Sequence, residues 1–207
     1  TTEMEPVVKS ALKMLVNDFQ AVLSSDVCIG KEGNIIINKD TTLLDKRKEA
    51  FQLKVSDDQL YVTGSDAHGV AYGILEISRL IGVSPWEWWA DVMPLKRSSF
   101  SLANGYVNLQ APSVEFRGIF INDEDWGLMP WSSLHYEPWH KPGRIGPKTN
   151  ARIFELMLRL RANTYWPAMH ECTQPFFLTQ GNREVAEQYG IYIGGSHCEP
   201  MASSTAG

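Results

Sequence analysis

The second half of the chain repeats one pattern of apolar and polar positions three times. In each repeat an apolar run of strand length ends directly in a group of ionisable residues, at 116–121 into 122–126, 163–169 into 170–172, and 190–195 into 196–199. Apolar positions at helical spacing lie between the repeats, over 149–162 and more briefly over 182–188. Strand, polar tip, helix and strand again is the order of a parallel α/β sheet, whose loops meet at one edge and carry the chemistry.

One connection in this half is unusually long. Residues 127–148 are rich in Trp, Pro and His, and we expect them to form a loop between the first strand and the helix at 149–162. At roughly 20 residues this loop is longer than most connections in compact domains, which favours a functional role.

The first half predicts a small α/β module with its own core. Apolar positions at helical spacing predict helices over 7–23 and 70–81, where Gly73 is expected to allow close packing of the second helix on a sheet. Short apolar or alternating runs predict the remaining elements, which are strands at 34–38, 50–55 and 60–63 and further β structure within 98–110. No acid, base or nucleophile is clustered in this half. With a seam at 111–113, the predicted domains are residues 1–110 and 111–207.

Composition narrows the partners that the chain is expected to have. The chain has 207 residues, of which 43% are hydrophobic and 21% are charged, as in an ordinary soluble protein. A net charge of −5 gives no electrostatic reason to bind nucleic acid, and no apolar run is long enough to span a membrane. We therefore expect neither nucleic acid nor membrane as a partner. The segment 1–5 lacks the basic and apolar regions of a signal peptide.

Carboxylates at the three predicted strand tips suggest acid–base chemistry. Such catalysis needs two carboxyl groups whose surroundings separate their pKa values. Inverting glycoside hydrolysis places these groups roughly 6.5–9.5 Å apart, and retaining hydrolysis about 5–5.5 Å, which are distances that neighbouring strand tips can span. The candidate catalytic residues are Asp123, Glu124, Glu171 and Glu199. Capping of the loop backbone is the competing interpretation for Asp123 and Asp125.

Other polar and aromatic residues at the tips are candidates for binding substrate. Tryptophan next to a polar tip can stack on a sugar ring or fill the core, and a histidine at a strand end can hydrogen-bond to substrate or to the protein itself. The candidate substrate-binding residues are Asn122, Asp125, Trp126, Trp166, His170 and His197.

Metal and thiol chemistry are the less favoured alternatives. The three cysteines, Cys28, Cys172 and Cys198, are odd in number and lack the spacing of a metal site or a disulfide framework. Convergence of His170 and His197 with two of these thiols is conceivable for zinc, but the spacing does not favour it. A Cys–His nucleophile is equally weakly supported, because thiols at strand ends are usually inert. We expect no metal and no cofactor.

Five stretches of the chain together resemble glycoside hydrolase family 115, the family of α-glucuronidases that act on glucuronoxylan. The stretches are GVAYGI at 69–74, IGVSPWEWWADV at 81–92, FRGIFINDEDWG at 116–127, NTYWPAMHE at 163–171 and GSHCEPM at 195–201. The resemblance covers most of the chain from about residue 46 onward, and several of these motifs are long and specific.

The resemblance implies a small N-terminal α/β domain followed by a TIM (β/α)8 barrel. It further implies inverting removal of glucuronic acid or its 4-O-methyl ether from glucuronoxylan, in the periplasm or outside the cell, and a homodimer through domains absent from this chain. By the resemblance, the tip residues 122–125, His170, Glu171, His197 and Glu199 line the sugar pocket. A complete barrel takes roughly 250 residues, whereas 112–207 amounts to 96, so we expect only the first three β/α units and a truncated barrel.

Two other functions remain open from the sequence. One is a non-catalytic carbohydrate-binding module that uses the aromatic residues near the tips. The other is a metal-dependent hydrolase that uses His170, Glu171, His197 and Glu199.

Overall fold

The computed structural model describes residues 4–30, 32–122, 126–138, 142–170 and 172–196. The chain divides into two compact units, Thr1–Glu115 and Phe116–Gly207. Within the described residues, no helix has both the length and the apolar character needed to cross a membrane.

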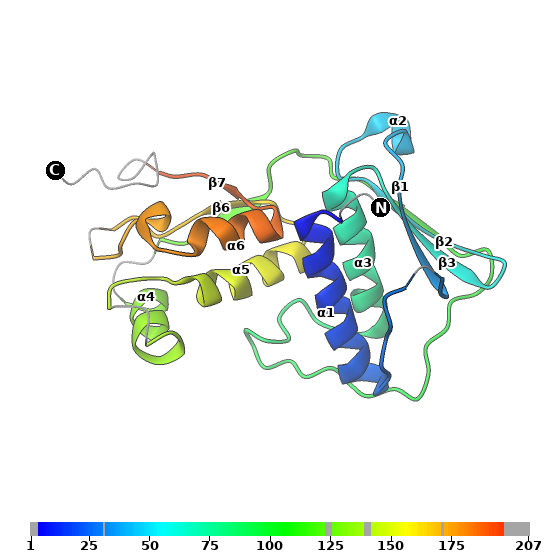
Figure 1. Cartoon of the computed structure of the whole chain (residues 1–207), viewed down its shortest axis with the longest axis horizontal. Helices are drawn as coiled ribbons and strands as arrows, with labels where there is room; N and C mark the ends of the chain where they lie inside the picture. The colour runs from blue at the N-terminus through cyan, green and yellow to red at the C-terminus, as the bar shows by residue number, and fades with distance from the viewer. Residues whose placement is uncertain (1–3, 31, 123–125, 139–141, 171, 197–207) are drawn as a thin grey trace. The chain divides into compact units, whose positions relative to one another are not determined.

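The first unit combines a four-stranded sheet with two long helices (Figure 1). The strands β1 (Ile35–Lys39), β2 (Phe51–Ser56), β3 (Gln59–Gly64) and β4 (Val107–Gln110) lie in the order β1-β3-β2-β4. Strand β1 pairs parallel to β3, while β2 pairs antiparallel to both β3 and β4. The small α/β module expected from the sequence is therefore built on a mixed sheet.

Helix α3 (Ala67–Ile81) packs on this sheet, helix α1 (Pro6–Leu23) packs along α3, and a single turn, α2 (Leu43–Lys46), follows β1. Asp66 begins α3 by accepting a hydrogen bond from the Gly69 amide, and Gly82 ends it in the left-handed conformation. A Cβ at Gly73 would lie 2.8 Å from Cγ1 of Val62 in β3. The predicted close packing of this helix on the sheet is confirmed.

The second unit contains the predicted parallel sheet, in the order β5-β6-β7. Strands β5 (Gly118–Phe120), β6 (Thr164–Trp166) and β7 (Tyr192–Ile193) are each shorter than the apolar runs that predicted them. Both pairings are parallel, with Gly118 opposite Thr164 and Thr164 opposite Tyr192. A Cβ at Gly118 would overlap the carbonyl oxygen of Thr164, so only glycine allows this approach of β5 to β6.

The connecting helices pack together against β6. Helix α5 (Pro147–Arg159) joins β5 to β6, and the 3-10 turn η2 (Phe176–Leu178) and helix α6 (Asn182–Tyr189) join β6 to β7. The ring of Phe154 in α5 meets the ring of Tyr165 in β6 edge-on at 5.4 Å, and it also contacts Tyr189 in α6. These aromatic contacts form the core beneath the sheet.

The segment expected to be a long loop contains helical structure instead. Helix α4 (Leu128–Trp131) runs directly into a π-helical turn, η1 (Ser132–Tyr136). Burial explains the difference, because Met129, Ser132 and Ser133 face the interior, and the Ser133 hydroxyl in η1 donates to the Met129 carbonyl in α4. The helical spacing of these buried positions was not recognised in the sequence, because the Pro, Trp and His residues of this segment suggest irregular structure.

Candidate active site

The three strands of the second unit end at the same level. The Ile121 amide donates to the Trp166 carbonyl at 2.9 Å, and the Gly194 amide donates to the Tyr165 carbonyl at 2.9 Å. The backbone that follows each strand therefore leaves the sheet from one edge, as expected for the carboxyl ends of parallel strands. This edge is the candidate active site.

Four of the ten predicted site residues can be located beside this edge or in the segments that leave it. Asn122 follows the β5 hydrogen bonds directly, Trp126 lies beyond it, Trp166 ends β6, and His170 lies in the segment after β6. The other six lie outside the described residues: Asp123, Glu124, Asp125, Glu171, His197 and Glu199. All four candidate catalytic carboxylates are among these six, so their assignment stays a prediction.

The two tryptophans differ in their surroundings. Trp126 is 92% exposed, so its ring does not fill the hydrophobic core. Trp166 is 40% exposed and meets the Phe120 ring edge-on at 5.9 Å. A Cβ at Gly194 would collide with the Trp166 indole, so this ring also packs against the β7 end. Trp166 leaves apolar surface at the edge, and Trp126 leaves apolar surface in the segment beyond β5; a sugar ring can stack on such surface.

His170 begins a tight turn that is tied to the preceding loop. The Thr173 amide donates to the His170 carbonyl at 2.9 Å, and the Gln174 amide donates to the Gly143 carbonyl at 2.8 Å. Nδ1 of His170 lies 3.1 Å from Sγ of Cys172. The imidazole thus has its Nδ1 engaged by a thiol, which leaves the Nε2 side for other contacts.

The chemistry available among the described residues does not include a metal centre. No group of three His, Cys, Asp or Glu residues is placed to hold a metal ion within the ranges that the structure describes. Three of the four residues in the metal-hydrolase alternative, Glu171, His197 and Glu199, lie outside those ranges.

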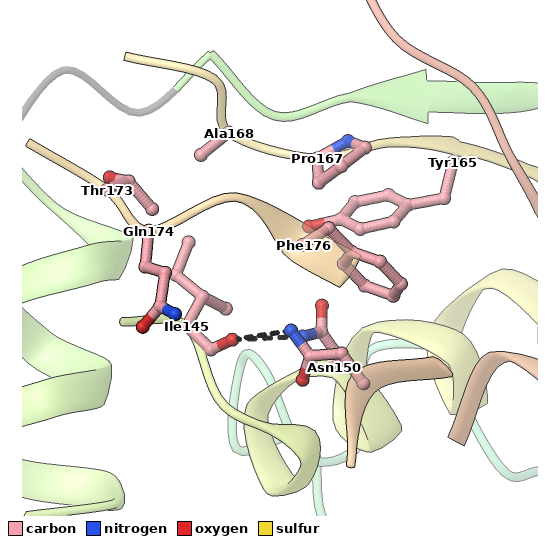
Figure 2. Close-up of a pocket in the computed structure, with 9 residues that line it drawn as sticks. Ile145, Asn150, Tyr165, Pro167, Ala168, Thr173, Gln174 and Phe176 are labelled. Atoms are coloured by element: carbon pink, nitrogen blue, oxygen red, sulfur yellow. Dashed lines mark hydrogen bonds between the residues drawn. The ribbon is translucent and has the colours of Figure 1, made fainter. Parts of the chain in front are cut away.

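A small cavity lies directly below the β6 tip (Figure 2). It is bordered by Tyr165, Pro167 and Ala168 from β6 and its continuation, and by polar side chains from the His170 turn and from the first turns of α5 and α6. Its volume is about 10 Å³, whereas sites for organic ligands usually measure roughly 300–1,000 Å³. The cavity therefore supports the tip and does not hold a sugar.

One buried carboxylate near this edge was missed by sequence reasoning. Glu137 is 1% exposed and accepts hydrogen bonds from the Lys148 amide at 3.0 Å and from the Thr149 amide at 2.8 Å. The Thr149 hydroxyl donates to it at 2.7 Å. Glu137 thereby caps the start of α5, a role usually taken by the residue just before the helix.

A sequence signal for this cap existed. Gly146 precedes α5 and offers no side-chain acceptor for the first amides of the helix. A Cβ at Gly146 would lie 2.6 Å from Oε1 of Glu137, so the glycine also leaves room for the carboxylate. The missing local cap indicated a remote one, although not which residue supplies it.

Comparison with known proteins identifies a family and a similar solved structure. Residues 109–207 match the sequence model of glycosyl hydrolase family 115. A solved structure described as a family GH115 4-O-methyl-α-glucuronidase with specificity for decorated arabinogalactans is 59% identical, with a TM-score of 0.92. The match covers 98% of this chain and 28% of that one, so the chain spans well under a third of this relative. No curated protein matches the chain.

More distant structures share the fold alone. A GH138 enzyme targeting pectin rhamnogalacturonan II is 18% identical with a TM-score of 0.60, and the match covers 94% of this chain and 24% of that one. An exo-β-N-acetylglucosaminidase of family GH20 from Vibrio harveyi, in its D437A form, is 16% identical with a TM-score of 0.56, over 91% of this chain and 31% of that one.

The 59% identical match extends over both units and over all three strands that end at the candidate active site. Together with the family match over 109–207, this similarity shows that the chain belongs to glycosyl hydrolase family 115.

Proposed function

We propose that the protein to which this chain belongs removes glucuronic acid or 4-O-methylglucuronic acid from the side chains of a polysaccharide. The observation that carries this proposal is the 59% identity over 98% of the chain to a structure described as a 4-O-methyl-α-glucuronidase. Hydrolysis of a glycosidic bond needs no redox cofactor, in keeping with the expectation from the sequence.

The polysaccharide itself has two candidates. Resemblance to the family led to glucuronoxylan as the expected substrate. The neighbour is described as specific for decorated arabinogalactans, and its identity to this chain favours arabinogalactan as the second candidate. Release of the acid from each polymer, measured separately, distinguishes the two.

The second unit is proposed to be the first part of a TIM (β/α)8 barrel, with β5, β6 and β7 as its first three strands. The parallel order β5-β6-β7 and the helices between the strands support this proposal. Large apolar side chains on these strands are also exposed, among them Ile119, Phe120 and Tyr192. Further strands would cover such side chains in a closed barrel.

Catalysis is proposed to use two carboxylates from the tips in an inverting reaction. Asp123, Glu124, Glu171 and Glu199 are the candidates, and their described neighbours Asn122, His170 and Ser196 follow strands that end at one edge. In an inverting reaction one carboxyl protonates the leaving oxygen, and the other activates a water on the opposite face of the sugar. Asn122, Asp125, Trp126, Trp166, His170 and His197 are proposed to bind the uronosyl unit.

The decisive experiment measures uronic acid release by the full-length protein. We expect release from glucuronoxylan or arabinogalactan, with initial formation of the β-anomer by NMR because inversion changes the configuration of an α-linked sugar. Asp123→Ala and Glu171→Ala should each lower kcat/KM at least a hundredfold, which is about 2.7 kcal/mol of transition-state stabilisation. Glu187→Ala is the matched control, because Glu187 lies exposed on α6 in a surface ion pair with Arg183.

Two results would contradict the proposed glycosidase function and favour an alternative. Binding of the polysaccharides without release of acid by the full-length protein would favour the carbohydrate-binding module. Loss of activity with a chelator and recovery with zinc would favour the metal-dependent hydrolase. Secretion or periplasmic export, and dimerisation through other domains, are further proposals that rest on the family alone.

A further inference from the structure

Three buried amide oxygens surround the cavity below the β6 tip without a hydrogen-bond donor among the described residues. They are Oδ1 of Asn150 in α5, Oδ1 of Asn182 in α6 and Oε1 of Gln174 in the His170 turn. Asn150 and Asn182 are each 1% exposed, so bulk solvent does not reach these groups. A buried acceptor that lacks a donor is strongly unfavourable, and such groups normally hold an ordered water.

The orientation of all three amides is fixed by their nitrogen atoms. Nδ2 of Asn150 donates to the Ile145 and Gly146 carbonyls, and Nδ2 of Asn182 donates to the same Ile145 carbonyl at 3.0 Å. Nε2 of Gln174 donates to the Leu178 carbonyl at 2.9 Å. Rotating any of these amides would place its oxygen against a carbonyl oxygen, so each oxygen stays on the side away from its nitrogen's partner.

The shared partner also brings two of the amides together. Because Asn150 and Asn182 both donate to the Ile145 carbonyl, their carboxamide groups lie next to each other where α5 and α6 begin. Figure 2 shows Tyr165 pointing from β6 into the same space, with Gln174 on the opposite side. A single small molecule here would touch the strand, both helices and the turn.

Volume and charge determine what that molecule is. The cavity measures about 10 Å³, close to the minimum of roughly 10–15 Å³ that one water requires. No carboxylate from the described part of the chain borders it, so a bare cation would be taken from water without a compensating negative charge. Water has two protons to donate and an oxygen that can accept from the Tyr165 hydroxyl.

We propose that this cavity is a binding site for one ordered water molecule, which donates one hydrogen bond to Oε1 of Gln174 and the other to Oδ1 of Asn150 or Asn182. The water thereby links the turn after His170 to the first turn of α5 or of α6, whose asparagines share the Ile145 carbonyl. It thereby holds in place the segment that leaves β6 at the candidate active site. This structural site does not depend on the proposed reaction.

A high-resolution crystal structure of the full-length protein, soaked in rubidium chloride, tests the ligand. We expect one peak without anomalous signal, about 2.7–3.2 Å from two of the amide oxygens. An empty cavity overturns the proposal, and so does an anomalous rubidium peak, which would identify a cation site.

Amide hydrogen exchange tests the link. Asn182→Leu removes one acceptor and fills part of the cavity, while Asn150 still donates to the Ile145 carbonyl. We expect at least tenfold faster exchange of the Thr173 and Gln174 amides, with no change in β2, whose residues lie in the other unit. Gln188→Leu is the matched control, because Gln188 lies on an exposed position of the same helix.

Unchanged exchange at Thr173 and Gln174 in a folded Asn182→Leu protein would overturn the link. If that variant does not fold, Gln174→Met replaces it, because methionine keeps the side-chain length and removes the oxygen. The same acceleration is then expected at the Thr173 amide, and its absence again contradicts the proposal.

Discussion

Removing the charge of Glu137 should destabilise the second unit far more than an exposed carboxylate would. In the Glu137→Gln variant, one of the two side-chain oxygens is replaced by an NH₂ group. That group faces either the Lys148 amide or the Thr149 amide and hydroxyl, all of which are donors. The variant therefore loses at least one charge-assisted hydrogen bond and leaves a buried donor without an acceptor.

The size of the effect follows from these contacts. A hydrogen bond to a charged group contributes about 1.5–3 kcal/mol, and loss of a helix cap costs about 0.5–2 kcal/mol. The carboxylate also lies at the positive end of the α5 dipole, where burial limits screening. We expect the free energy of unfolding to fall by about 2–3 kcal/mol, while the m value, its slope against urea concentration, stays unchanged.

Urea unfolding of the full-length protein, followed by circular dichroism, measures this loss. Glu187→Gln is the control, since its ion pair with Arg183 is exposed and such pairs contribute about 0–1 kcal/mol. A loss below about 1 kcal/mol for Glu137→Gln, or one equal to the control, would refute the capping role.

A second variant checks the same geometry. Gly146→Ala places a methyl group 2.6 Å from the present position of Oε1 of Glu137, and should displace the carboxylate from the helix start. Because both substitutions disrupt one contact, their combined effect should be smaller than the sum of the two single effects. Additive losses would show that Gly146 and Glu137 act independently.

Three further predictions address other parts of the structure. Gly118→Ala should lower the free energy of unfolding in urea by about 3 kcal/mol, because the added Cβ would overlap the Thr164 carbonyl. Gly33→Ala is the control and should change the free energy of unfolding by no more than about 0.5 kcal/mol, since its Cβ would make ordinary contacts at 3.9 Å and 4.0 Å. Trp126→Ala should raise KM for the uronosyl substrate about three- to tenfold, because stacking on the sugar is lost. The variant should keep the Tm of the wild type, because the ring is 92% exposed. A lowered Tm at constant KM would contradict a role in binding substrate. Burial, and to a smaller extent the neighbouring carboxylate of Glu155, raise the pKa of Tyr189. Above a pH of about 10 the folded protein therefore retains the phenolic proton of Tyr189, whereas the unfolded chain loses it. Stability should therefore fall as pH rises, by about 1 kcal/mol more in the wild type than in Tyr189→Phe between about pH 9 and 11; parallel curves would refute this coupling.

Periodicity carried most of the information about the fold. The apolar runs at 116–121, 163–169 and 190–195, with helical spacing between them, predicted a parallel sheet, and β5-β6-β7 confirms it. This works because the side chains of a strand or helix are buried on a regular period, which the sequence records directly. The strands themselves are shorter than the runs, since the sheet ends where neighbouring backbones no longer pair.

The candidate active site was only partly accessible to the same reasoning. Polar tips after three strands indicated one functional edge, and the hydrogen bonds of Ile121 and Gly194 bring the three strand ends to the same level. The roles of Asp123, Glu124, Glu171 and Glu199 stay predictions. The sequence pattern identifies which residue types lie near a site. A catalytic role depends on the distances between the carboxyl groups and from them to the substrate, which the pattern does not contain.

The sequence by itself therefore determined most of the elements, the parallel order of the second sheet and the family. Only the tertiary structure decided that Glu137, rather than the residue just before the helix, caps α5, that residues 128–136 are helical, and that Asn150, Asn182 and Gln174 enclose one cavity. The physical reason is that periodicity reports which face of an element is buried, but not which distant side chain it meets. Those partners are chosen by packing, which satisfies buried polar groups wherever the chain brings them together.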